Sequence, residues 1–381
     1  MATRKKIVFP YYNSYYTSTA IIIYQTNILK SLNLLDDAIK PEIYIWHTHQ
    51  SPLQEIQAIQ YPYIHYINIK SLGFRIKKTL SKMVDVFGLS KTILFNTKYD
   101  CIYPAYQDNF LNGIKERIYW KADFQENYFP QYITAVEMNW VKAFFKHLQN
   151  NDSLSTLVLS SYDCKNDLEK FYPEIKNPVK LFRFVSHIPK QLNFENITTI
   201  QQKFNITLPY FIVCNQYWPH KNHLVVLKAL HQLKQENKLN FQVVFTGKTS
   251  SIRGNEYFTE LKNYITENNL ANDIVITDFV ERNEQLILMK KALAIVQPTT
   301  FEGWSTVIED GKALNQYVIA SNIKVNMEQI QENVSFFNAE DSNELSKILA
   351  NFSINKPVIQ IKEYSKNIED SLQDLKVIFS L

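Results

Sequence analysis

The segment AIVQPTTFEGWSTVIEDGKALNQYVIA, residues 294–320, contains a complete strand–turn–helix–strand unit. The apolar run at 294–297 favours a buried strand, a turn follows around Gly303, and residues 305–314 have the spacing of an amphipathic helix. A second apolar run at 317–320 predicts another buried strand. Two short apolar strands joined through a helix are typical of parallel neighbours in a sheet that helices cover on both faces.

The same alternation extends in both directions along the chain. Strands are predicted at 6–9, 42–46, 64–67, 101–103, 117–120, 156–159, 181–184, 210–214, 242–246 and 274–277. Helices are predicted at 20–32, 72–87, 222–237, 257–268, 283–292 and 342–351. This pattern predicts an α/β chain with two doubly wound, Rossmann-like domains.

We place the N-terminal domain at 1–190, a linker at 191–207 and the C-terminal domain at 208–360. The final segment, 361–381, has a helical pattern and is surplus to the second sheet. We expect this helix to return to the N-terminal domain.

Composition agrees with this organisation. A chain of 381 residues exceeds what one hydrophobic core supports, and its 45% apolar content lets each half bury a core. We find no window of about 18 uninterrupted apolar residues and no apolar run at the start that resembles a secretion signal. Three widely spaced cysteines argue against a disulfide framework or a zinc cluster. These features predict a cytoplasmic protein.

Several chemistries are disfavoured by missing motifs. The seven glycines form no G-x-G-x-x-G fingerprint, which argues against a bound NAD or FAD. The sequence contains no D-x-D and no G-x-S-x-G, so neither a metal-bound diphosphate nor a serine hydrolase is supported. It also lacks a basic stripe interleaved with aromatic residues. We therefore expect no cofactor, no metal and no nucleic-acid partner.

Ligands of doubly wound sheets bind beyond the carboxyl ends of the strands. After the strand at 210–214 comes NQYWPHKNH, and Lys221 stands at the start of the following helix. The unpaired N–H groups of a helix start already favour an anion, so Lys221 could neutralise a diphosphate there. A solvated surface lysine is the alternative. His220 and His223 could line the same loop, but two histidines are too few for a metal site.

The turn after the strand at 294–297 carries a second set of polar groups. Gly303 would let the backbone approach a ligand closely, and the amides of Ser305 and Thr306 open the next helix. Glu302 and Asp310 lie about two helical turns apart, and carboxylates are natural acceptors for hydroxyl groups. We expect Glu302 to contact a sugar and Asp310 a ribose. A polar helix face formed by Asp310 and Lys312 is the alternative.

The stretch FEGWSTVIED, residues 301–310, resembles the E-x7-E signature of glycosyltransferase family 4, whose members are retaining enzymes of the GT-B fold. The segment NQYWPHKNH is similar to that family's phosphate-binding turn, and VFTGK at 244–248 and ITDFV at 276–280 are similar to its intervening strand ends. In the first half, WKADFQ at 120–125 resembles a segment that faces the donor sugar. The resemblance covers residues 115–330 well and the first hundred residues in outline.

The resemblance implies a GT-B fold with two domains facing a cleft, and a hexosyltransferase (EC 2.4) that moves a sugar from a nucleotide diphosphate sugar to a glycan or lipid-linked acceptor, with retention and without metal. Catalytic roles fall on Glu302, Lys221 and Asp123. The donor-binding residues are Gln216, Lys221, Gly247, Phe279, Val280, Glu302, Gly303, Trp304, Ser305, Thr306 and Asp310. The acceptor-binding residues are Tyr15, Tyr16, Asp123 and Gln125.

The chain departs from the family pattern at four places. Asp310 is shorter than the usual glutamate, and Gln216 replaces the arginine that often accompanies the phosphate lysine. The usual Gly-Gly loop after the first strand is replaced by the tyrosine-rich residues 11–18, and Ala122 stands where a histidine is common before Asp123. Asp123 could instead cap a helix. Two other functions stay open: a non-catalytic subunit that binds a partner enzyme, and another GT-B activity such as a phosphorylase or epimerase.

A basic amphipathic segment suggests peripheral contact with the inner face of a membrane. Residues 1–190 carry 23 Lys+Arg against 16 Asp+Glu, whereas residues 191–381 carry 18 against 21. Within residues 72–91, one predicted helix face is apolar and is flanked by five cations with Asp85 as the only acid. An ordinary core helix with solvated lysines is the alternative.

We expect the triple variant Lys77→Glu, Lys78→Glu, Lys82→Glu to lose binding to anionic liposomes. Each basic residue near an anionic surface contributes about 1 kcal/mol, so the loss should be large at low salt. Co-sedimentation with anionic and neutral liposomes measures it. Equal binding of the wild type to both lipids, or an unaffected variant, would leave only the core-helix interpretation.

Overall fold

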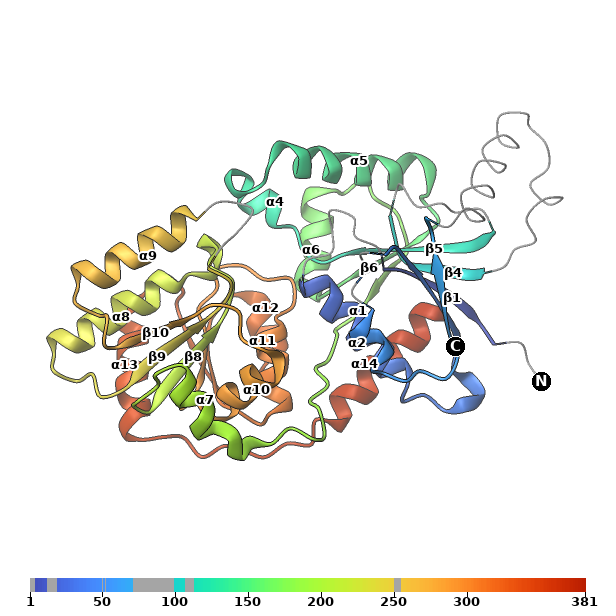
Figure 1. The fold of residues 1–381 in the computed structure, drawn as a ribbon. Coiled ribbons are helices and arrows are strands. Elements are labelled where there is room, and N and C mark those ends of the chain that lie inside the picture. The colour runs from blue at the N-terminus through green and yellow to red at the C-terminus, as the bar shows by residue number, and fades with distance from the viewer. Residues whose placement is uncertain are drawn as a thin grey trace. The chain divides into compact units, whose positions relative to one another are not determined.

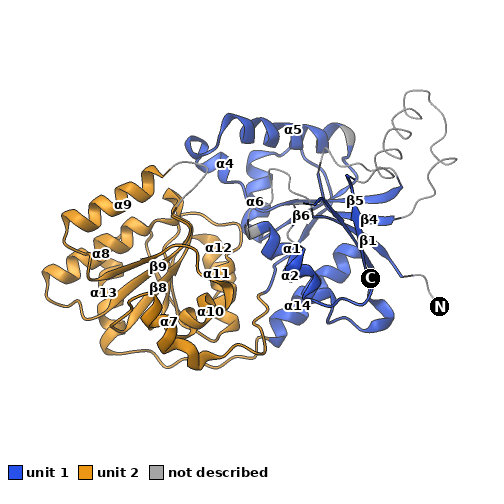
Figure 2. Cartoon of the chain, viewed as in Figure 1, with its two compact units in different colours: residues 1–185, 365–381 blue, residues 186–364 orange. Residues whose placement is uncertain are grey.

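The computed structural model describes residues 4–11, 19–49, 51, 53–70, 99–106, 113–249 and 255–381. The chain divides into two compact units, residues 1–185 with 365–381 and residues 186–364 (Figure 2). It therefore passes between the units twice, at Ser186 and after Tyr364.

Unit 1 contains a parallel sheet of seven strands in the order β3-β2-β1-β4-β5-β6-β7 among the described residues (Figure 1). The strands are β1 Lys6–Tyr11, β2 Glu42–His47, β3 Ile64–Asn68, β4 Tyr99–Ala105, β5 Ile114–Lys121, β6 Thr156–Leu159 and β7 Val179–Leu181. The helices are α1 Thr19–Leu32, α2 Gln54–Gln57, α4 Gln125–Tyr128, α5 Ala135–Asn151, α6 Tyr162–Phe171 and α14 Ser365–Phe379. This arrangement confirms the predicted doubly wound sheet.

Several elements of unit 1 differ from the sequence prediction, since α2, α4, α5 and α6 were not predicted and β7 has other bounds. Strand β7 ends at Leu181 instead of spanning 181–184, because its pairing with β6 runs from Val179 to Leu181. Helix α5 was not predicted, although its start carries a clear signal. The Thr134 side chain accepts from the Glu137 amide while the Glu137 carboxylate accepts from the Thr134 amide, which is a capping box.

The last helix, α14, belongs to unit 1, as the sequence predicts. Its side chains Leu375, Ile378 and Phe379 are buried. The Phe379 ring makes edge contacts with Phe9 of β1 and Tyr103 of β4, at centroid distances of 6.2 and 5.5 Å. Such aromatic burial fixes the end of the chain against the sheet in which the chain begins.

Unit 2 contains a parallel sheet of six strands in the order β10-β9-β8-β11-β12-β13 among the described residues. The strands are β8 Tyr210–Cys214, β9 Gln242–Thr246, β10 Ile274–Thr277, β11 Ile295–Gln297, β12 Val318–Ser321 and β13 Val334–Phe337. The helices are α7 Ile197–Lys203, α8 His223–Gln235, α9 Glu256–Glu267, α10 Arg282–Lys291, α11 Thr306–Ala313, α12 Lys324–Gln329 and α13 Ser342–Ile354. Strand order reverses between β8 and β11, so a topological switch point lies there.

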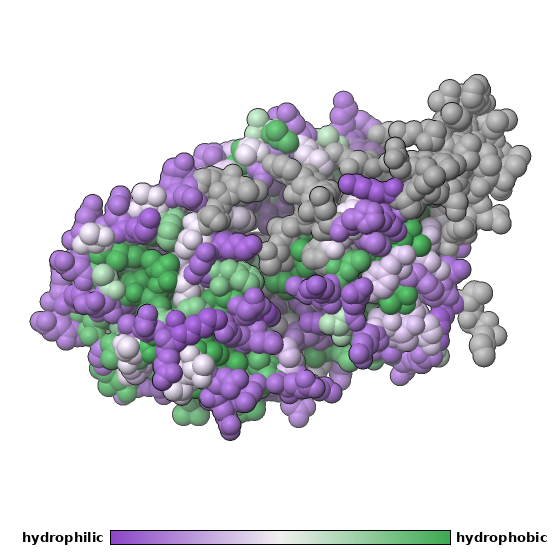
Figure 3. Space-filling view, viewed as in Figure 1, coloured by the Kyte–Doolittle hydropathy of each residue, from purple (hydrophilic) through white to green (hydrophobic). Residues whose placement is uncertain are grey.

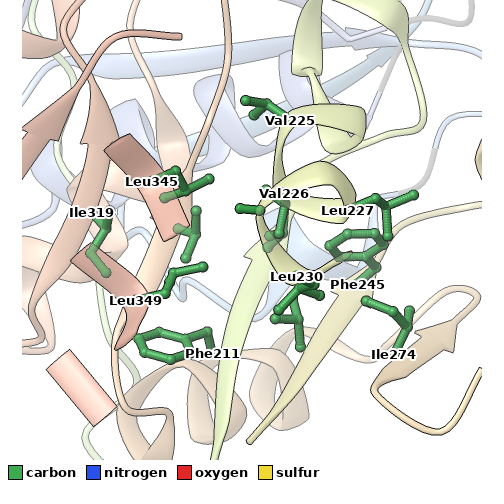
Figure 4. Close-up of a cluster of buried hydrophobic side chains, with 14 of the residues drawn as sticks. Phe211, Val225, Val226, Leu227, Leu230, Phe245, Ile274, Ile319, Leu345 and Leu349 are labelled. Atoms are coloured by element: carbon green, nitrogen blue, oxygen red, sulfur yellow. The ribbon is translucent and has the colours of Figure 1, made fainter. Parts of the chain in front are cut away.

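One core of unit 2 lies between α8, α13 and the sheet (Figure 4). Val226 and Leu230 of α8 are fully buried, as are Leu345 of α13 and Phe211 of β8. Burial of each such side chain stabilises the unit by about 1.5–3 kcal/mol. The packing holds the start of α8, and thus the loop that precedes it, in place.

The predicted linker, 191–207, is folded into unit 2. It contains a 3-10 turn at Phe194–Asn196 followed by α7. Ile200 and Ile206 are buried in the second core of the unit, and Phe204 packs against it. The burial of these side chains explains why the segment is structured although its hydrophobic pattern is irregular.

Three predicted features lie outside the described residues: the loop residues Tyr15 and Tyr16, the helix at 72–87 and the basic segment at 72–91. Every helix in the described part of the chain is too short or too polar to span a bilayer. On the face shown in Figure 3, hydrophilic side chains cover most of the coloured surface, with apolar groups between them.

Candidate functional site

The loops that follow β8 and β11 form one layer at the switch point of unit 2. The Thr300 amide donates to the His220 carbonyl at 2.8 Å, and the Thr299 hydroxyl donates to the same oxygen at 3.0 Å. The Asn222 side chain donates to the Pro298 carbonyl at 3.1 Å. These bonds link two segments almost eighty positions apart and fix the residues that they carry.

Lys221 and Glu302 form an ion pair at this place. The Lys221 Nζ lies 2.6 Å from Glu302 Oε1, and the two side chains are only 15% and 12% exposed. Asn222 adopts a left-handed conformation with φ 55°, which asparagine tolerates well, and so turns the chain from Lys221 into α8. Because the pair is largely shielded from water, its charges interact more strongly than those of a surface pair.

Gln297, the last residue of β11, was not identified from the sequence. It has no exposed surface, and its amide nitrogen donates to Glu302 Oε1 at 2.9 Å and to the Ser305 hydroxyl at 3.1 Å. Its carbonyl oxygen accepts from the Asn215 side chain at 2.9 Å. A polar residue that ends an otherwise apolar strand was the signal available in the sequence.

Ser305 is the N-cap of α11, and its hydroxyl accepts from the Ile308 amide at 3.3 Å. The sequence predicts that the Ser305 amide opens toward a ligand. In the structure this amide donates to the Gln329 side chain of α12 at 2.9 Å, and Gln329 in turn donates to the Ser305 carbonyl at 2.7 Å. This amide is therefore already paired within unit 2, and the role of Ser305 in donor binding stays a prediction.

Asp310 lies on α11 with 3% of its surface exposed. Its carboxylate accepts from Arg282 Nη1 at 2.6 Å, from Arg282 Nη2 at 2.5 Å and from the Ser186 hydroxyl at 2.5 Å. Neither partner was identified from the sequence, since each lies far from Asp310 along the chain. The alternative of a solvated helix face does not hold for this buried side chain.

Gly247 follows β9, and its lack of a side chain is required by packing. A Cβ atom at this position would lie 2.3 Å from the Asn215 carbonyl oxygen, well inside contact distance. Gly247 therefore brings the end of β9 against the loop after β8. This packing role does not test the prediction that Gly247 takes part in donor binding.

The remaining predicted donor residues follow the carboxyl ends of strands β8, β10 and β11. Phe279 is 56% exposed, with Lys248 Nζ 5.6 Å from its ring centroid, and Val280 is 8% exposed. Gln216 is exposed, Gly303 is buried and Trp304 is half-buried. Thr306 is the first residue of α11.

Asp123 and Gln125 belong to unit 1, at the start of α4. The Gln125 amide donates to the Asp123 carboxylate at 3.0 Å, so Asp123 does act locally as a turn-forming acceptor. Next to it, Glu126 is buried and pairs with Lys121 at 3.0 Å. Burial raises the pKa of Glu126, while the charge of Lys121 opposes this rise.

His223 is fully buried at the start of α8, among the rings of Tyr217 and Phe245. Burial lowers its pKa to about 3, and the nearby charge of Lys221 acts in the same direction. His223 is therefore a neutral core residue at neutral pH. No group of three or more His, Cys, Asp or Glu side chains arranged to hold a metal occurs among the described residues.

Residues 196–370 match the family model described as Glycosyl transferases group 1. A curated relative, the O-antigen chain mannosyltransferase RfbU of Salmonella typhimurium, is 25% identical over 199 residues, which are 51% of this chain and 53% of that protein. The match thus spans about half the length of the relative. The match to the family model lies mainly within unit 2 and extends into α14.

Solved structures resemble the whole chain. A glycosyltransferase from Rickettsia africae is 17% identical with a TM-score of 0.63, and the alignment covers 99% of this chain and 94% of that one. HepE of Anabaena, in complex with UDP and glucose, is 15% identical with a TM-score of 0.64 and coverage of 99% and 95%. These likenesses show the fold: two Rossmann-like α/β domains of the GT-B type, as the sequence predicts.

We expect the His223→Phe variant to lose part of the acid sensitivity of the protein. An unfolded histidine binds a proton below about pH 6.5, whereas folded His223 does so only near pH 3, so its burial destabilises the fold as the pH falls through this window. The wild type should lose about 2 kcal/mol more than the variant between pH 7.5 and pH 5. Urea unfolding at both pH values measures this difference.

The control is Leu230→Ala, which lowers stability by opening a cavity in the same helix but removes no titratable group, so it should keep the wild-type dependence on pH. An identical pH dependence in His223→Phe and wild type would show that His223 titrates normally.

Proposed function

We propose that this chain is a glycosyltransferase that moves a hexosyl residue from a nucleotide diphosphate sugar to a glycan or lipid-linked acceptor. The observation that carries the proposal is the Lys221–Glu302 pair, held at the switch point of a unit that matches the group 1 glycosyl transferases. This is the place where doubly wound sheets bind their ligands.

In this proposal Lys221 stabilises the negative charge that develops on the leaving diphosphate. Lys221 already lies at the start of α8, whose first amides add a favourable dipole. In the unliganded protein its charge is compensated by Glu302. Diphosphate binding would replace a carboxylate oxygen by a phosphate oxygen, which is an equivalent charge-assisted partner.

Glu302 then accepts from hydroxyl groups of the donor sugar. Gln297 holds its carboxylate in one orientation, so its hydrogen-bonding capacity is directed before the donor arrives. Asp310 accepts from the ribose, and Phe279 and Val280 border the base. Asp123 and Gln125 of unit 1 belong to the acceptor side in this proposal.

The finer proposals rest on the resemblance to glycosyltransferase family 4. We propose that the chain is a member of that family, that it transfers the sugar with retention of the anomeric configuration, and that it needs no metal. The absence of a D-x-D motif from the sequence also supports activity without a metal. UDP is present in the HepE complex, which makes UDP-sugars the first donors to test. We also propose a cytoplasmic location with weak membrane contact through residues 72–91.

A thermal-shift screen of UDP-, GDP-, ADP- and dTDP-sugars tests the proposal. A ligand that binds the folded state at 100 times its Kd stabilises it by about 2.7 kcal/mol, which is readily detected. The positive donor is then incubated with glycan acceptors and nucleotide release is followed. A non-catalytic subunit would bind the donor but release no nucleotide with any acceptor, and an absence of all donor binding would refute the proposal.

We expect Glu302→Gln to abolish transfer while the protein stays folded. The amide keeps the shape of the side chain but cannot offer a charged acceptor to sugar hydroxyls, and hydrogen bonds to charged groups are worth about 1.5–3 kcal/mol. Initial rates of nucleotide release should therefore fall by at least about tenfold. The exposed Glu332→Gln of the same unit serves as the control. Near-normal turnover of Glu302→Gln would make Glu302 a structural residue.

We expect full activity in the presence of EDTA, because Lys221 and the helix start supply the positive potential that a metal would otherwise supply. Rates measured with EDTA, with Mg²⁺ and with Mn²⁺ should agree within error. Inactivation by chelation that either metal reverses would contradict the metal-independent mechanism.

A further inference from the structure

The carboxylate of Asp310 is held by three hydrogen bonds. Oδ1 accepts from the Ser186 hydroxyl and from Arg282 Nη2, and Oδ2 accepts from Arg282 Nη1. An ionised carboxylate has about four acceptor positions, so these bonds leave room for one more donor. The bidentate geometry with Arg282 permits a single orientation of the carboxylate.

Arg282 is placed at the edge of the proposed nucleoside site. It is the first residue of α10 and follows Val280 by two positions. Its side chain is 37% exposed, whereas the side chain of Asp310 is 4% exposed. A ligand that approached Asp310 would therefore meet the guanidinium of Arg282 as well.

The neighbouring acid, Glu309, does not depend on Arg282. Glu309 has 1% of its surface exposed and has its own partners. It accepts from Lys312 at 2.8 Å and from Gln329 at 3.1 Å, and the Tyr364 hydroxyl donates to its other oxygen. The charge of Glu309 is therefore compensated without Arg282.

We propose that Arg282, held beside Asp310, is a second residue that recognises the ribose of the donor, an inference that rests on the proposed function. The carboxylate accepts from one ribose hydroxyl, and the guanidinium donates to the oxygen of the neighbouring hydroxyl. A hydroxyl group can both donate and accept, so a vicinal diol matches this acceptor–donor pair. Ser186 is a positioning residue that fixes the carboxylate from its other side.

The shorter side chain of Asp310 fits this assignment. A glutamate would reach one methylene further, and a guanidinium beside it would be less needed for contact with the sugar. Here the exposed Arg282 extends the recognition surface beyond the buried carboxylate. Lysine could not replace it, because an ammonium group lacks the planar fork that holds both carboxylate oxygens.

Calorimetric titration with UDP, GDP and their 2′-deoxy counterparts tests the inference. The wild type should bind a ribonucleotide about 10- to 100-fold more tightly than its deoxy form, the range expected for one lost hydrogen bond to a charged group. Arg282→Lys and Arg282→Gln should reduce this preference to below about threefold. The lysine variant keeps the charge next to Asp310 and therefore guards against simple misfolding, which thermal unfolding checks.

Lys203→Gln is the matched control, because it removes a cation that pairs with Glu284 of α10 and not with Asp310. It should keep the wild-type preference for ribose. The inference is overturned if folded Arg282 variants keep that preference, or if the wild type binds ribo- and deoxyribonucleotides equally. A wild type that binds no nucleoside diphosphate would overturn the proposed function together with this inference.

Discussion

The side-chain amide of Gln297 connects the two loops on which the candidate site is built. It accepts from Asn215 after β8, and it donates to Glu302 and Ser305 after β11. Because Gln297 is fully buried, each amide group left unpaired would cost about 1–3 kcal/mol, so the three bonds together select one arrangement. Strands β8 and β11 are neighbours in the sheet, and the Gln297 amide links the loops that follow them. These hydrogen bonds hold Glu302 in one position.

A second constraint follows from the three acids at 302, 309 and 310. All three are largely buried, where a charge without a partner is costly. Each has its own cation: Lys221 for Glu302, Lys312 for Glu309 and Arg282 for Asp310. Removing one cation would leave one specific carboxylate uncompensated, which is a more severe defect than losing an exposed ion pair.

The sequence predicts much of unit 2 because local patterns and strand order suffice for it. Lys221 and Glu302 could be assigned to one site in advance, since both follow the carboxyl ends of predicted parallel strands. Arg282 and Ser186 could not be assigned to Asp310 from the sequence, because they lie 28 and 124 positions from it along the chain. Their contacts depend on how α10 and the segment at Ser186 pack within unit 2. The hydrogen bond from the Ser305 amide to Gln329 could not be predicted either, because it depends on how α12 packs against α11. Helix α5 was different, since its capping box was present in the sequence and was overlooked.

The proposed function places an energetic condition on the Lys221–Glu302 pair. Before the donor binds, the lysine charge is already compensated by a carboxylate at 2.6 Å. A diphosphate that displaces Glu302 exchanges one charge-assisted bond for another, so little of its attraction to Lys221 remains as net affinity. The displaced carboxylate must then find new donors, and hydroxyl groups of the sugar would supply them. Tight binding therefore requires the diphosphate and the sugar together, which couples recognition of the leaving group to recognition of the group transferred.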